Sequence, residues 1–136
     1  MKVVLETGLS GRSAVQVTED KTAVAYGSGG VEVFATPAMI GLMENAAMKA
    51  VDPMLPEGYG TVGTRLDVRH MAATPKGFRV YAEAKLVEVK GNRLTFEVIA
   101  FDEVERIGEG LHERFIIEKQ PFLDKVADKK RANRDE

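Results

Sequence analysis

The hydrophobic positions between residues 36 and 51 repeat with the period of an α-helix. Their side chains fall on two adjacent rows of one helical surface, formed by Met39, Met43, Ala46 and Ala50 and by Ile40, Ala47 and Val51. The remaining positions Gly41, Asn45 and Lys49 point away from these rows. The spacing predicts an amphipathic helix with a broad buried face.

Both ends of this helix carry recognisable signals. Thr36 precedes Pro37; a threonine side chain can accept a hydrogen bond from the first turn, and proline lacks only an N–H that would be unpaired there. Asp52 precedes Pro53, and the residue before a proline is disfavoured in a helix. We predict a helix that begins at Pro37, is capped by Thr36 and ends near Asp52.

The hydrophobic period changes to two after residue 60, which is typical of β-strands. Strands are expected over about residues 61–70, 80–86, 94–100 and 107–117, and residues 90–92 close a hairpin. On the first of these strands one dry face is expected to hold Val62, Thr64, Leu66, Val68 and His70.

The last strand has a different character. Leu111, Phe115 and Ile117 share one of its faces. Gly108 and Gly110 lie within the strand and indicate a bulge or a close approach of another backbone.

Less regular segments lie at the two ends of the chain. Residues 12–18 have the pattern of a strand and residues 22–26 that of a second, shorter one, and Gly27, Gly29 and Gly30 predict a flexible connection to the helix. Residues 124–136 are mostly charged, so we expect a solvated or frayed tail. The sequence therefore predicts one α+β domain over residues 1–123, in which a curved antiparallel sheet wraps one long helix.

Composition and charge exclude several classes of function. The formal net charge of −2 gives no electrostatic reason to expect nucleic acid or an anionic membrane as a partner. The chain has no cysteine, which excludes disulfides and thiolate chemistry, and no apolar run long enough for a signal peptide or a membrane span. We expect a soluble cytoplasmic protein.

Common cofactor and nucleophile motifs are also missing from the sequence. The two histidines have no close acidic cluster that would complete a zinc site. The glycines at positions 27, 29 and 30 are not followed by the Lys-Ser/Thr of a P-loop, and no serine occupies a G-x-S-x-G turn. We expect neither a metal nor a cofactor.

Glu44 is the single acid of the predicted helix and lies beside its second apolar row. Partial desolvation of a carboxylate is one way in which a protein prepares a base or a nucleophile. The same position also suits an ordinary acid at the edge of a surface helix, because glutamate is a good helix former. Taken alone, Thr36 is more typical of a helix cap and His70 of a core histidine than of catalysts.

Three segments of the chain stand out when they are taken together: FATPAMIGLMENAA, GTRLDVRHMAATPKG and GEGLHER. In this order and at these separations they resemble the hotdog-fold acyl-CoA thioesterases, most closely the fluoroacetyl-CoA thioesterase group. The resemblance covers about residues 33–114. The catalytic Thr, Glu and His of that family fall on Thr36, Glu44 and His70. The family's glycine near the thioester falls on Gly63, and its G-x-H-E-R segment ends at Arg114.

The resemblance implies hydrolysis of an acyl-CoA thioester to a free acid and CoA, without a metal. Glu44 would act either as a general base or as a nucleophile that forms an acyl anhydride, and His70 would move protons near neutral pH. Gly63 would let the thioester carbonyl approach the backbone, and the guanidinium of Arg114 would suit a phosphate or carboxylate of the substrate.

Two other functions fit the same fold. One is a non-catalytic acyl-CoA-binding or ligand-sensing module, which would need neither Glu44 nor His70. The other is a hydratase acting on an enoyl thioester, which the Thr/Glu/His set disfavours.

The positions of Thr36 and Glu44 imply a site shared between two chains. They are eight positions apart, which corresponds to about 12 Å along a helix axis. A hydroxyl and a carboxylate at that separation do not meet within one chain, whereas two helices running in opposite senses about a two-fold axis bring them together. We expect a homodimer with its sites at the interface.

One stretch departs from the closest relatives. The fluoroacetyl-CoA enzymes place bulky aromatic residues ahead of the catalytic helix, as a lid over the acyl group. The matching residues 26–31 are YGSGGV, with glycine in place of those side chains. We expect a broader acyl-CoA thioesterase with little preference for fluoroacetyl-CoA.

Overall fold

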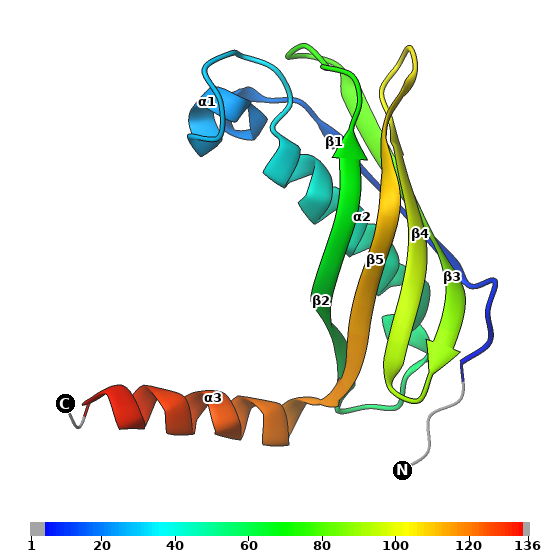
Figure 1. Ribbon diagram of the computed structural model, residues 1–136, viewed down its shortest axis with the longest axis vertical. Helices are drawn as coiled ribbons and strands as arrows, with labels where there is room; N and C mark the ends of the chain where they lie inside the picture. Colours follow the sequence, from blue (N-terminus) through cyan, green and yellow to red (C-terminus); the bar gives the residue numbers. More distant parts are fainter. Residues whose placement is uncertain (1–4, 135–136) are drawn as a thin grey trace.

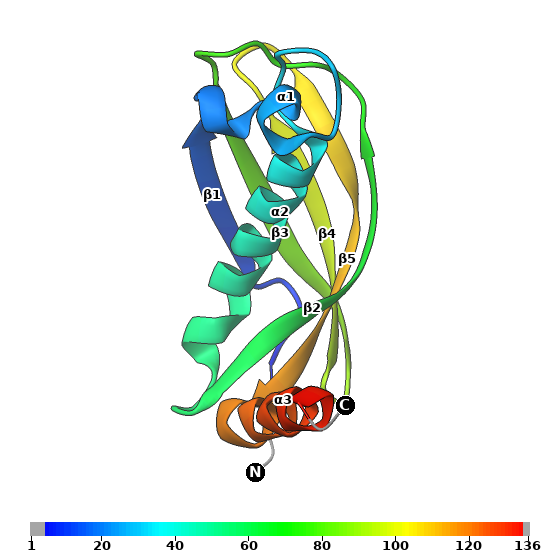
Figure 2. The same cartoon turned by 90° about the vertical axis from the view of Figure 1, so that its left-hand side faces the viewer.

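The computed structural model describes residues 5–134, and its centre is a five-stranded antiparallel sheet curled beside one long helix (Figure 1). The strand order is β1-β3-β4-β5-β2. The strands are β1 (Ser10–Gln16), β2 (Tyr59–His70), β3 (Arg79–Lys90), β4 (Arg93–Phe101) and β5 (Arg106–Glu118). The long helix is α2 (Thr36–Val51), which lies across the concave side of the sheet (Figure 2). The predicted α+β class is confirmed.

Helix α2 packs closely on β1 and β3 because small residues meet at the contact. A Cβ added at Gly11 of β1 would lie 2.2 Å from the carbonyl oxygen of Ala46, so a side chain at Gly11 would force the helix away from the sheet. Both predicted apolar rows face the sheet: Ile40 is half-buried, and the buried residues are Met39, Met43, Ala46, Ala47, Ala50 and Val51. Strand β2, at the edge of the sheet, contacts the helix less extensively than β1 and β3 do.

The ends of α2 agree with the prediction in one respect and differ in another. The helix ends at Val51 and passes into a 3₁₀ turn, η2 (Asp52–Met54), as the Asp-Pro pair predicts. At the other end Ala35 occupies the cap position, and Thr36 is already helical. The prediction that Thr36 caps the helix was wrong, because its hydroxyl bonds to a side chain of β2 instead.

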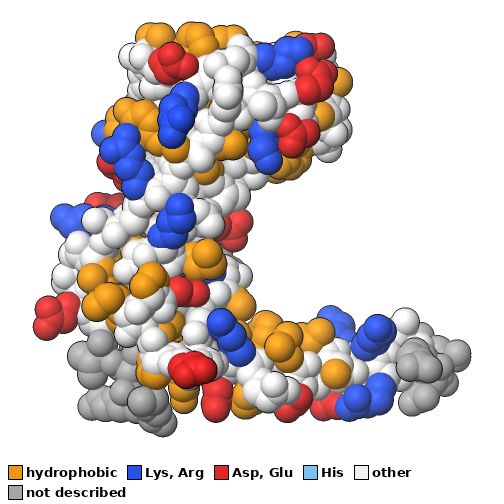
Figure 3. Space-filling view, turned by 180° about the vertical axis from the view of Figure 1, so that it is seen from behind, with side chains coloured by type: hydrophobic (Ala, Val, Ile, Leu, Met, Phe, Trp, Pro, Cys, Tyr) orange, Lys and Arg blue, Asp and Glu red, His pale blue; other side chains and the backbone are white. Residues whose placement is uncertain are grey.

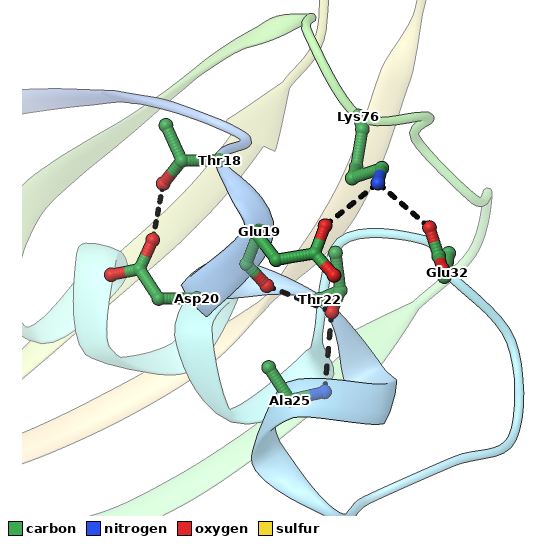
Figure 4. Close-up of polar contacts among 7 residues, drawn as sticks. All are labelled: Thr18, Glu19, Asp20, Thr22, Ala25, Glu32 and Lys76. Carbon is green, nitrogen blue, oxygen red and sulfur yellow. Dashed lines mark hydrogen bonds and ion pairs between the residues drawn. The ribbon is translucent and has the colours of Figure 1, made fainter.

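The predicted short strand at residues 22–26 was also wrong. After a 3₁₀ turn, η1 (Glu19–Lys21), this segment forms a short helix, α1 (Ala23–Tyr26). The Thr22 hydroxyl accepts a hydrogen bond from the backbone N–H of Ala25 (Figure 4), and Gly27 ends the helix with a left-handed φ of 72°. A capping threonine and a left-handed glycine therefore outweigh a weak strand pattern.

In β2 and β5 the buried and exposed side chains differ from the alternation expected from the sequence. A bulge between Gly63 and Arg65 of β2 shifts the alternation by one residue, so Thr61 and Gly63 face the helix side and the predicted inward position of Val62 and Thr64 was wrong. Past the bulge, Leu66 and the following alternate residues are half-buried, as predicted.

On β5 the buried face is the one that carries His112 and Arg114. Leu111 and Phe115 share a face, as predicted, but that face is exposed to solvent. A Cβ added at Gly110 would lie 2.2 Å from the carbonyl oxygen of Asp67, which confirms the predicted close approach of another backbone.

The charged C-terminal segment is an exposed helix rather than a frayed tail. Helix α3 (Lys119–Arg134) leaves the end of β5 and projects away from the body of the molecule (Figure 1). The predicted boundary at residue 123 falls inside this helix. Over residues 5–134, none of the helices has the length and apolar character needed to cross a membrane.

Candidate functional site

Thr36 and His70 meet at one end of the molecule. The Thr36 Oγ1 and His70 Nδ1 atoms lie 2.7 Å apart, which joins the first turn of α2 to the last residue of β2. Phe34 contacts the imidazole edge-on, with ring centroids 6.5 Å apart. Both residues line a pocket of about 270 Å³, together with Ala23, Ser28, Val33, Phe34 and Met71 to Ala73.

The environment of His70 favours its neutral form. Burial lowers the pKa of His70 because the charged imidazolium loses hydration, and the backbone of Ala72 only partly opposes this shift. The other ring nitrogen, Nε2, is buried and has no hydrogen-bond partner within residues 5–134. A buried polar atom without a partner is costly, so His70 has an unused site for a ligand or a proton.

Glu44 and Gly63 meet further along α2. Glu44 is half-buried, and a Cβ added at Gly63 would lie 2.7 Å from its Oε2 atom. The same Cβ would lie 3.2 Å from Cε1 of His112 and 3.5 Å from Nη1 of Arg114. The missing side chain at position 63 therefore leaves room for the Glu44 carboxylate beside these two residues of β5.

Arg114 lies inside the protein and is held by its neighbours. Its Nε donates to Thr61 Oγ1 at 2.8 Å and its Nη2 to the Thr61 carbonyl at 2.9 Å, while the Thr61 hydroxyl donates to Asp52 at 2.6 Å. Burial lowers the pKa of Arg114, and the charges of Asp52 and Glu44 oppose this shift. Since an arginine stays protonated in proteins, a fixed positive charge lies close to Glu44.

His112 is also buried, and its two partners fix its protonation. Nδ1 lies 2.8 Å from the carbonyl oxygen of Arg65, which can only accept, and Nε2 lies 3.2 Å from Nη1 of Arg114, which can only donate. The ring is therefore neutral with its proton on Nδ1. Burial is the largest cause that lowers the pKa of His112; Arg114 lowers it further, while the Arg65 carbonyl, Glu44 and Glu113 oppose the shift. A ring held in this way positions Arg114 and does not carry protons.

The predicted site residues thus form two groups. Thr36 and His70 make one, and Glu44, Gly63 and Arg114 make the other. Helix α2 is unbroken from Thr36 to Val51, so about 12 Å of helix separates Thr36 from Glu44. Sequence reasoning missed Thr61 and Asp52, which anchor Arg114. The signal that could have found them is Arg114 itself, because an arginine on a buried face must have acceptors nearby.

Comparison with known proteins places the chain in a family. The sequence pattern of the fluoroacetyl-CoA-specific thioesterase family, FlK, matches residues 17–120. The fluoroacetyl-CoA thioesterase of Streptantibioticus cattleyicolor is 48% identical over 98 residues, which cover 72% of this chain and 70% of that protein.

Solved structures agree with the sequence match. A structure of the fluoroacetyl-CoA thioesterase FlK has a TM-score of 0.86 and 39% identity, and the match covers 93% of this chain and 98% of that one. A Thermus thermophilus hypothetical protein of the thioesterase superfamily has a TM-score of 0.89 and 30% identity, with 96% and 97% covered. The hotdog fold expected from the resemblance is confirmed, and the protein belongs to the fluoroacetyl-CoA-specific thioesterase family.

Proposed function

We propose that the protein hydrolyses acyl-CoA thioesters to a free acid and CoA, with Thr36, Glu44 and His70 as its catalytic residues. Membership of a thioesterase family supports the reaction. The observation that carries the assignment of residues is the 2.7 Å contact between Thr36 and His70, which joins two residues 34 positions apart in the sequence. A variant of the related FlK enzyme has been solved with fluoroacetate and CoA, which supports a CoA thioester as the class of substrate.

Glu44 starts the reaction in one of two ways. As a general base, it takes a proton from water while the water oxygen attacks the thioester carbonyl. As a nucleophile, it attacks that carbonyl itself and forms an acyl anhydride, which water then hydrolyses. In both routes the C–S bond breaks and the departing thiolate of CoA takes up a proton. His70, whose Nε2 has no partner within residues 5–134, is proposed to receive the proton that water loses and to pass it to this thiolate. The Thr36 hydroxyl holds the His70 ring for this step.

The working unit is proposed to be a cytoplasmic homodimer with sites shared between its chains. The separation of the two groups along α2 supports the shared site, because neither group is a complete catalytic set. Within residues 5–134 the outer edge of β2, the strand that contains Gly63, pairs with no other strand. That edge is available to pair with a second sheet. A cysteine-free chain fits a reducing compartment. Residues 1–123 are proposed as the catalytic domain.

A thiol-release assay over short, long, branched, aromatic and fluorinated acyl-CoAs tests the function. We expect turnover of several of these thioesters by the wild-type protein and loss of turnover in Glu44→Gln. Saturable binding of acyl-CoA without turnover would overturn the proposal in favour of a binding or sensing module.

A further inference from the structure

Helix α3 carries apolar side chains that the rest of its own chain leaves uncovered. Phe122, Leu123 and Val126 are 38%, 56% and 51% exposed, and their spacing places them on one side of the helix. The space-filling view shows hydrophobic side chains along α3 near the point where it leaves the body (Figure 3). An isolated 16-residue helix is only marginally stable in water, so this helix needs a surface to pack on.

The uncovered side of α3 faces a groove. The groove has a volume of about 330 Å³ and lies between α3, the end of α2 and the first half of β2. Its apolar lining is Met48, Val62, Ile117, Phe122 and Leu123. Because β2 is the edge strand of the sheet, the groove opens where a second copy of the chain would join.

A second uncovered apolar group lies at the opposite end of α2. Val24 and Val31 are exposed and belong to the segment of residues 22–34 that precedes the helix, whereas Tyr26 of the same segment lies in a groove beside Val15 of β1. Part of this segment lines the pocket of Thr36 and His70, through Ala23, Ser28 and Phe34. The glycines between these residues provide no side chains to cover that pocket.

A two-fold arrangement that brings Thr36 of one chain to Glu44 of the other also brings the apolar side of α3 close to the apolar residues of the partner's segment 22–34. With the partner's Thr36 opposite Glu44, the seven residues 45–51 of α2, about 10 Å of helix, lie opposite the segment that precedes the partner's Thr36. The groove of α3 continues from that end of α2. Residues 22–34 of the partner therefore lie next to the groove.

We propose that α3 of each subunit packs its Phe122, Leu123 and Val126 side against residues 22–34 of the partner subunit. The helix then covers the partner's pocket from outside and replaces, from the other chain, the cover that the glycine-rich segment lacks. This inference rests on the shared site of the proposed function.

Cross-linking between engineered cysteines tests the contact directly, because the chain has no cysteine of its own. Ser28, which is exposed and lines the pocket of Thr36 and His70, provides the partner position. Ser28→Cys and Leu123→Cys proteins are mixed, allowed to exchange subunits and treated with a short bismaleimide. We expect a covalent dimer that contains one chain of each variant. The matched control replaces Leu123→Cys by Asp128→Cys, which lies on the opposite side of the same exposed helix and should give no such product.

A second measurement asks whether the contact contributes to assembly and to substrate binding. Leu123→Ser should raise the dissociation constant of the dimer about tenfold and raise KM for acyl-CoA, while Asp128→Ser should change neither. Circular dichroism of each variant checks that the body of the protein is folded.

The outcomes separate this inference from the proposed function. A dimer by ultracentrifugation that gives no Ser28–Leu123 cross-link, or an equal yield from the Asp128 control, overturns the α3 contact while thioester hydrolysis by the wild-type protein still stands. A monomer that hydrolyses acyl-CoA overturns both the contact and the shared site. Absence of hydrolysis with a specific cross-link overturns the proposed function alone.

Discussion

The Thr36 hydroxyl lies 2.7 Å from Nδ1 of His70 and makes no capping bond to its own helix. A threonine that served as a helix cap would contribute about 1 kcal/mol to stability, whereas this one is oriented toward an imidazole. Thr36→Ala should therefore leave the urea midpoint nearly unchanged and lower kcat about a hundredfold, within the range typical of proton-transfer residues. Thr36→Ser keeps the hydroxyl and should retain most of the activity. Equal losses in the two variants would contradict the role of the hydroxyl.

Glu44→Gln tests the group that activates water or attacks the thioester. The amide keeps the shape of the side chain but can neither take a proton nor act as a nucleophile, so kcat should fall about 10²- to 10⁴-fold with little change in Tm. Glu83→Gln is the control, because Glu83 is a half-buried acid of β3 whose carboxylate forms a surface ion pair with Arg12. Near wild-type turnover by Glu44→Gln would remove Glu44 from the catalytic set.

Complementation tests the shared site. Thr36→Ala and Glu44→Gln chains should each be nearly inactive as homodimers. In a mixed dimer, one of the two sites takes Thr36 from one chain and Glu44 from the other, so it is intact. An equimolar mixture forms mixed dimers as about half of the total and should recover about a quarter of wild-type activity, since each mixed dimer holds one working site of two. No recovery after verified subunit exchange is the result that would sink the shared site.

The long helix and the sheet could be predicted because their hydrophobic periods are local. The 3.6-residue repeat from Met39 to Val51 depends on neighbours in the sequence, and so does the hairpin turn at residues 90–92. The acyl-CoA thioesterase family was also recognised from sequence and is confirmed.

The inner faces of β2 and β5 depend on contacts that are distant in the sequence. A single bulged residue near Gly63 reverses the alternation of β2. His112 and Arg114 point inward because they bond to each other and to residues of β2. No local pattern records these partners, so the sequence alone does not tell which face of β5 is buried.

Acid should weaken the fold through its two histidines. The pKa values of His70 and His112 are lowered in the folded state by burial, so between those values and the unfolded value of about 6.5 the unfolded chain binds more protons. The free energy of unfolding then rises with pH through this window and falls as pH drops below about 6.5. Urea unfolding at a series of pH values from 7.5 to 5.5 measures this slope.

The slope should be smaller in His112→Gln than in the wild type, although the variant is less stable at every pH because Arg114 and the Arg65 carbonyl lose a partner. The two effects are separable in a plot of the free energy of unfolding against pH. Loss of the titrating ring changes the slope, whereas loss of the hydrogen bonds lowers the free energy at every pH. A wild-type slope of zero across this range would contradict the neutral, buried state of both rings.

We expect the segment ahead of α2 to decide how well the enzyme distinguishes fluoroacetyl-CoA from acetyl-CoA. Residues 26–31 carry three glycines, and Tyr26 and Val31, the large side chains of this stretch, are exposed rather than folded over the pocket of Thr36 and His70. Lys76 pairs with Glu32, the residue after this stretch, and with Glu19 of η1, the turn ahead of α1, at 2.7 Å each (Figure 4). These ion pairs are exposed and contribute little to stability, and they lie outside residues 26–31, so they do not replace the side chains that the glycines lack.

Discrimination between a fluorine and a hydrogen requires close contacts around the acyl group and exclusion of water, because the two atoms differ little in size. A glycine-rich segment provides neither, and a cover supplied by α3 of the partner would close the pocket from outside without contacting the acyl carbon. We therefore expect kcat/KM for fluoroacetyl-CoA to lie within about tenfold of that for acetyl-CoA, a difference of about 1.4 kcal/mol in transition-state binding, and longer acyl chains to be accepted. Steady-state kinetics with both thioesters measures the ratio, and a preference of several orders of magnitude for the fluorinated substrate would show that selectivity does not depend on side chains in this segment.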